Sequence, residues 1–135
     1  MRPVVARRLV PRPAEELYAL LADLRGHWDL AGRWVHPLEL RADGGTVRVR
    51  GPLGLRRTVS TQLDTLEPPR RVSGLAHSGA TRAAISWDLS PSDGGTLVTL
   101  RADLLEAGPL DRLVLALGGR AWMGGRFAAT LQRLG

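Results

Sequence analysis

Apolar side chains recur with two different spacings along the chain, and the change from one spacing to the other marks the elements. The apolar and basic stretch Val4–Val10 ends at prolines, which is typical of a strand. The next apolar positions follow one helical face, at Leu17, Leu20, Leu21 and Leu24. Pro13 suits the first position of such a helix and Gly26 its end. The pattern therefore predicts a strand followed by a short helix.

Six segments of strand length come next, and they are separated by turn residues rather than by helices. They run over residues 34–42, 46–50, 55–66, 71–77, 82–90 and 96–104. Asp43-Gly44-Gly45 and Asp93-Gly94-Gly95 predict tight hairpins whose glycines take a positive φ. Because all connections are too short for a parallel crossover, we expect an antiparallel meander.

Helical spacing returns over residues 109–134 and predicts one long final helix. Its expected inner surface carries Leu113, Leu117, Met123 and Phe127. Two glycine pairs, at 118–119 and 124–125, interrupt this helix, and each glycine costs up to about 1 kcal/mol relative to alanine. A kink, a break or vacant space beside the helix would explain them. The chain thus predicts one α+β domain over residues 1–135, a seven-stranded curved antiparallel sheet around a long C-terminal helix.

Composition narrows the class of protein. With 44% hydrophobic and 24% charged residues, the chain has the profile of an ordinary globular protein. No apolar run approaches the roughly 20 residues of a membrane span, and the N-terminus lacks the apolar region of a signal peptide. No cysteine is present, so disulfides and thiolate sites are excluded. We therefore expect a cytoplasmic protein.

Charge favours no nucleic-acid partner, although the net charge is +6. All 19 basic residues are arginine, as expected of a GC-rich bacterial genome, and they cluster weakly. Aromatic side chains that could stack on bases are few. The three histidines, His27, His36 and His77, lack the spacing of metal ligands, so no metal is expected.

Two side chains on the predicted strands point to a ligand. Alternation over residues 82–90 turns Trp87 to the interior, as core or as the wall of a cavity. Alternation over residues 55–66 aims Arg57 inward, where a guanidinium could bind a carboxylate or a polarised carbonyl. The alternative for Arg57 is a position near the strand end that reaches solvent.

Three stretches resemble one known family. Residues 10–23 with Trp28, residues 87–100, and the two ends of the last helix, 108–113 and 127–134, resemble the START-like superfamily (SRPBCC, birch-pollen-allergen type) and its bacterial polyketide cyclase/dehydrase group. The resemblance implies the helix-grip fold and a cavity between sheet and C-terminal helix for a lipid or polyketide-like molecule. It does not imply one reaction, because one fold hosts many functions.

The resemblance suggests where a ligand would lie. In this fold the segment around His36 often forms the pocket mouth, where a histidine could act as a general base; a surface histidine is the alternative. Arg57 and His36 are the catalytic candidates of the alternative hypothesis, a cyclase, aromatase or dehydratase. No cofactor is expected, and a homodimer is left open. The predicted ligand-binding residues are Trp28, Trp34, Arg57, Trp87, Leu113, Leu117, Met123 and Phe127.

Overall fold

The computed structural model describes residues 3–23, 34–50 and 56–134. The strands are β1 (Val4–Val10), β2 (Val35–Leu40), β3 (Gly44–Arg50), β4 (Arg56–Glu67), β5 (Arg71–Ser78), β6 (Thr81–Ser92) and β7 (Gly95–Glu106). The helices are α1 (Ala14–Leu21), α3 (Pro109–Val114), the π-helical turn η2 (Leu115–Gly119) and α4 (Arg120–Gln132). The predicted order of elements is confirmed, apart from the last helix.

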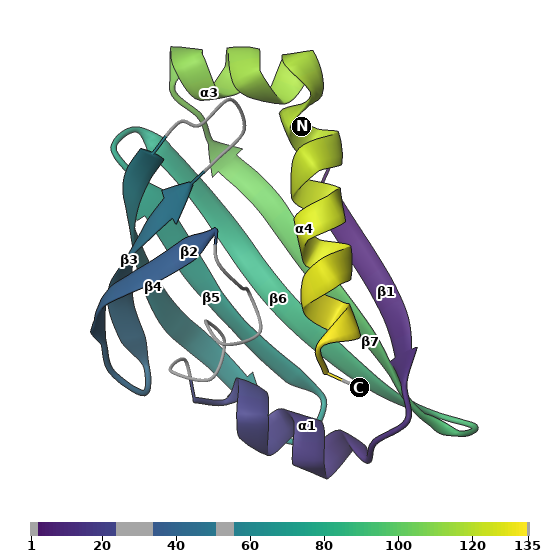
Figure 1. Ribbon diagram of the computed structural model, residues 1–135. Coiled ribbons are helices and arrows are strands. Elements are labelled where there is room, and N and C mark those ends of the chain that lie inside the picture. Colours follow the sequence, from purple (N-terminus) through teal and green to yellow (C-terminus); the bar gives the residue numbers. More distant parts are fainter. Residues whose placement is uncertain (1–2, 24–33, 51–55, 135) are drawn as a thin grey trace.

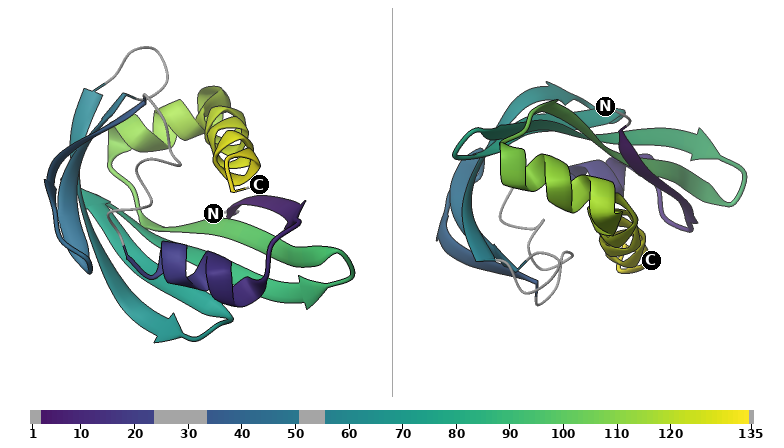
Figure 2. Two further views of the ribbon diagram at one scale, coloured as in Figure 1. Left: turned by 60° about the horizontal axis from the view of Figure 1, so that its bottom comes forward. Right: turned by 90° about the horizontal axis from the view of Figure 1, so that it is seen from above.

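The strands form one antiparallel sheet in the order β1-β7-β6-β5-β4-β3-β2, so β1 and β2 are its edges. The sheet bends into a trough, with β2, β3 and β4 turned up as one wall (Figure 2). Helix α4 crosses the concave side, α3 lies at one end of the trough and α1 at the other (Figure 1). The predicted α+β helix-grip fold is confirmed.

Strand alternation divides the sheet into an inner and an outer face. On β7, Val98 and Leu100 are buried, whereas Leu97 and Arg101 on either side of this pair are exposed. The inward residues of β6 and β7 pack with α1 and with the C-terminal half of α4. This main cluster contains Val10, Ala14, Leu17, Leu21, Val72, Trp87, Leu89, Val98, Leu100, Phe127, Leu131 and Leu134.

A second, smaller cluster lies in the other wall of the trough. Val35 and Val47 are its buried members, with Val49 and Val59 packed against them. Helix α4 packs mainly on β1 and β7, and α1 on β5 and β6. The helices therefore pack mainly away from the part of the inner surface that lies between the two clusters.

The predicted long final helix is broken at Gly118. This residue has φ 115° and ψ 0°, a left-handed conformation that an L side chain rarely adopts. The chain turns there between α3 and α4, which are set at an angle to each other (Figure 1). Gly124 and Gly125 remain inside α4, and a Cβ on either would meet no atom within 4 Å. Of the expected kink, break or vacant space, the first pair gives the break. Gly125 of the second pair is exposed, so the space beside it is solvent.

Two local predictions were wrong in detail. Gly94 and Gly95 take positive φ as predicted, but Gly44 and Gly45 do not; they are buried residues of β3. A Cβ on Gly45 would lie 2.4 Å from the carbonyl oxygen of Glu39, so close packing of the two strands explains the glycine there. Pro13 is the extended residue before α1 rather than its first helical residue.

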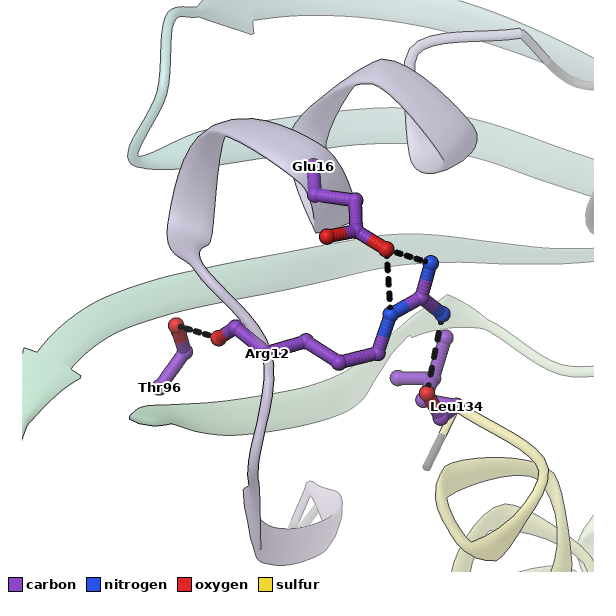
Figure 3. Close-up of polar contacts among 4 residues, drawn as sticks. All are labelled: Arg12, Glu16, Thr96 and Leu134. Carbon is purple, nitrogen blue, oxygen red and sulfur yellow. Dashed lines mark hydrogen bonds and ion pairs between the residues drawn. The ribbon is translucent and has the colours of Figure 1, made fainter. Parts of the chain in front are cut away.

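Arg12 ties the beginning of α1 to the end of α4 (Figure 3). Its Nη1 donates to the carbonyl oxygen of Leu134 at 3.0 Å, and its Nε donates to Glu16 Oε1 at 2.8 Å. The buried Thr96 hydroxyl donates to the Arg12 carbonyl oxygen at 2.7 Å. The C-terminal end of α4 is thereby held against the sheet at the α1 end of the trough.

Candidate ligand-binding cavity

A cavity of about 340 Å³ lies between the inner face of the sheet, η2 and α4. Its volume falls in the range of about 300–1,000 Å³ that is typical of small-molecule sites. The walls come from every strand and from α3, η2 and α4, so residues far apart in the sequence enclose one space.

Alternate strand residues supply an almost entirely apolar lining. The apolar wall residues are Val4, Trp34, Val35, Val47, Val49, Val59, Ala76, Ala83, Ile85, Trp87, Leu100, Ala102, Leu104, Val114, Leu115, Trp122, Met123 and Phe127. Three of them, Ala76, Ala83 and Ala102, are alanines on neighbouring strands. Their short side chains leave room that a larger residue would fill.

Five of the predicted ligand-binding residues come together in this wall. They are Trp34, Arg57, Trp87, Met123 and Phe127. Trp87 serves in both of the expected ways, because its side chain belongs to the main cluster and also borders the cavity. Trp28, like the helix end expected at Gly26, lies outside the described residues.

Leu113 and Leu117 do not lie on the inner surface where they were expected. Their side chains are 55% and 74% exposed, and neither borders the cavity. The break at Gly118 gives α3 and η2 a direction of their own, and Asp111, Val114 and Leu115 face inward instead. A single helical phase across residues 109–134 therefore placed the two leucines on the wrong face.

Arg57 faces the cavity as predicted, and its guanidinium is held by a carboxylate. Nη1 donates to Asp111 Oδ2 at 2.5 Å, and Nη2 donates to Asp111 Oδ1. The Thr81 hydroxyl also donates to Asp111 Oδ2, and it accepts a hydrogen bond from the Gly108 amide at 3.1 Å. Strand β4 is thus joined to the beginning of α3 and to β6.

The same contacts shift the titration of Asp111. Hydrogen bonding from Arg57 lowers the pKa of the Asp111 carboxyl below its ordinary value; burial acts in the opposite direction, and the Thr81 hydroxyl reinforces the lowering. The carboxylate is ionised at neutral pH, so Arg57 and Asp111 compensate each other's charge.

The second catalytic candidate, His36, lies on the edge strand β2 with an exposed side chain and does not border the cavity. His77 of β5 does border it, also with an exposed side chain. Of the two catalytic candidates, the structure places only Arg57 in the cavity wall.

Among the polar and aromatic groups of the wall that were not predicted from the sequence are Asp111, Arg120 and Trp122. Trp122 packs edge-on against Trp34, with ring centroids 5.5 Å apart and an interplanar angle of 89°. The guanidinium carbon of Arg126 lies 5.2 Å from the Trp122 ring centroid. Only the phase of α4 after the break could have identified Arg120 and Trp122, and the sequence left that phase undefined.

None of the helices in the described ranges is long and apolar enough to cross a membrane.

A curved antiparallel sheet that holds a mostly apolar cavity against a C-terminal helix defines the class of helix-grip domains. A family model described as "Polyketide cyclase / dehydrase and lipid transport" matches residues 1–135, and the chain belongs to this family. The predicted assignment to the START-like superfamily is thereby confirmed. No curated protein matches the chain.

Solved structures of bacterial proteins share the fold. TTHA0849 from Thermus thermophilus is similar over 98% of this chain and 94% of its own, with 21% identity and a TM-score of 0.69. Ms6760 from Mycobacterium smegmatis is similar over 98% and 87%, with 14% identity and a TM-score of 0.71. DR_A0006 from Deinococcus radiodurans is similar over 76% and 83%, with 26% identity and a TM-score of 0.60.

Proposed function

We propose that this protein binds a hydrophobic small molecule, lipid-like or polyketide-like, in the cavity between the sheet and α4. The observation that carries the proposal is the space of about 340 Å³ with an almost entirely apolar wall. When this space is empty, its apolar side chains are in contact with water, which is unfavourable. A ligand that buries apolar surface gains about 25 cal/mol per Å² and so offsets that cost.

A catalytic role has less support from the site. A cyclase, aromatase or dehydratase needs a group that is free to polarise or deprotonate the ligand. The charge of Arg57 is compensated by Asp111, which accepts hydrogen bonds from two of its five N–H donors, and His36 is outside the wall. The site therefore favours binding over catalysis.

The test fills the cavity from a position where the side chain points inward. Ala83→Leu on β6 places a larger apolar group in the wall, whereas Ala84→Leu adds the same atoms to the opposite face of the same strand. We expect N-phenyl-1-naphthylamine, an uncharged fluorescent probe, to bind the wild type and the Ala84 variant and to lose most of its affinity for the Ala83 variant.

Thermal unfolding of all three proteins shows whether each remains folded. Equal binding of the probe by folded Ala83 and Ala84 variants, or no binding by the wild type, contradicts the proposal. Native mass spectrometry of the purified wild-type protein provides an independent measurement, since an apolar molecule that co-purifies with it identifies the ligand class directly.

A further inference from the structure

The charged groups of the cavity wall do not all compensate one another. The wall residues that carry a full charge at neutral pH are Arg57, Asp111 and Arg120. The first two form the bidentate ion pair described above. Arg120 forms no ion pair with any residue in the described ranges, so within those ranges one positive charge at the cavity has no counter-ion.

Arg120 also has unused hydrogen-bond donors. It is the first residue of α4, and its Nη2 donates to the carbonyl oxygen of Pro3 at 3.0 Å. Its Nε is buried and has no acceptor. A guanidinium carries five N–H donors, and a charged donor that is buried without an acceptor is unfavourable.

A second unpaired donor belongs to the same wall. The indole Nε1 of Trp34 is likewise buried without an acceptor. Trp34 packs on Trp122, which follows Arg120 by two residues in the first turn of α4, so both donors belong to the part of the wall where α4 begins. Among the residues that the structure describes, these two nitrogens are the only buried side-chain polar atoms without a partner, and both are donors.

A wall that lacks acceptors is complementary to a ligand that supplies them. We infer that the cavity binds an apolar molecule that ends in a carboxylate, with the carboxylate at Arg120 and the apolar part along the strand residues. The inference rests on the proposed function and specifies its ligand. A carboxylate matches the single uncompensated charge, and a guanidinium is well suited to pair with it, whereas a phosphate monoester brings about −1.5 to −2 charges.

Octanoate and octan-1-ol differ only in the head group, so they separate the charge from the apolar chain. Arg120→Gln removes the charge and keeps an amide that can donate to Pro3. Arg112→Gln is the control, because Arg112 is an exposed arginine of α3 outside the cavity wall. Displacement of N-phenyl-1-naphthylamine measures the affinity of each ligand for each protein.

We expect Arg120→Gln to weaken octanoate binding roughly 10- to 100-fold, the range of a hydrogen bond to a charged group. Octan-1-ol should change by less than about threefold, because its affinity depends mainly on the apolar wall. Arg112→Gln should leave the ratio of the two affinities as in the wild type.

Two results overturn the inference and leave the proposed function standing. In the first, the wild type binds the probe, but Arg120→Gln changes the affinities for octanoate and octan-1-ol by the same factor or leaves both unchanged. The other needs no variant: octyltrimethylammonium, with the same chain and the opposite charge, binds the wild type as tightly as octanoate. If neither the probe nor any octyl compound binds, the proposed function itself fails.

Discussion

The ion pair between Arg57 and Asp111 allows a quantitative prediction about stability. Asp111→Asn keeps the shape of the side chain but removes its charge and one of its acceptor oxygens. The variant leaves the guanidinium of Arg57 without a counter-ion. If the amide nitrogen replaces Oδ1, Arg57 Nη2 loses its acceptor; if it replaces Oδ2, both Arg57 Nη1 and the Thr81 hydroxyl lose theirs. Since these bonds join β4 and β6 to α3, their loss should destabilise the whole α3 end of the trough.

The size of the expected loss of stability depends on how exposed the Arg57–Asp111 pair is to water. The side chains of Arg57 and Asp111 are 32% and 15% exposed, between a surface pair and a buried one. Surface pairs contribute roughly 0.2–1 kcal/mol, and removing one partner of a buried pair costs roughly 3–5 kcal/mol. We expect Asp111→Asn to lower the free energy of unfolding by about 1–3 kcal/mol, which corresponds to a fall of roughly 4–12 °C in Tm for a chain of this length.

The effect should also depend on pH with a defined sign. The pKa of Asp111 is lower in the folded protein than in the unfolded chain, so the unfolded chain takes up the proton first as the pH falls. The contribution of Asp111 is therefore complete above the ordinary carboxyl pKa and is lost as the pH falls through the folded pKa. The wild type and the variant should converge in stability below about pH 4.

Urea denaturation followed by circular dichroism, at pH 7 and at steps down to pH 3, measures the difference. Asp103→Asn is the control, because Asp103 pairs with Arg101 on the exposed face of β7 and its loss should change stability little. A difference at pH 7 no larger than that of the control, or a difference that stays constant down to pH 3, refutes the reasoning.

Three further substitutions test the helices. Gly118→Ala should lower the free energy of unfolding by roughly 1–3 kcal/mol because of its positive φ, whereas Gly124→Ala should raise it by up to about 1 kcal/mol because the added methyl meets open space. Urea denaturation measures both, and equal effects would show that the break does not depend on Gly118. Arg12→Met should lower stability by roughly 1–2 kcal/mol and speed amide hydrogen exchange in the last turn of α4, since the carbonyl of Leu134 loses its donor. Unchanged exchange there would show that Arg12 does not hold the helix end.

The sheet could be predicted from the sequence because its signals are local. Turn residues predicted the number and order of strands, and alternation placed Trp87 on the inner face. The bounds were less certain, since the strand predicted over residues 82–90 extends to Thr81–Ser92 through hairpin pairing with β7. Hydrogen bonds between the strands continue beyond the residues that show the alternation of apolar and polar side chains.

The chemistry of the cavity could be predicted only in part, because it depends on which residues meet. The sequence aimed Arg57 inward, but its partner Asp111 lies 54 positions away. It also showed two glycine pairs, and glycine populates both helical and left-handed conformations, so the pattern did not decide which pair breaks the helix. Because the position of the break determines which face each residue takes, the orientations of Leu113, Leu117 and Arg120 could not be predicted.

The two edge strands of the sheet carry features that oppose pairing with a strand of another chain. The sheet of the described residues does not close on itself, so β1 and β2 are edges where another chain could add a strand. On β2, Pro37 has no N–H to donate, and the register shifts between Pro37 and Glu39. On β1, Arg7 and Arg8 are exposed and bring positive charge to the edge. A second copy that approached either edge would meet an interrupted hydrogen-bond ladder or a like charge, and the trough can stay open without acting as a template for strand addition.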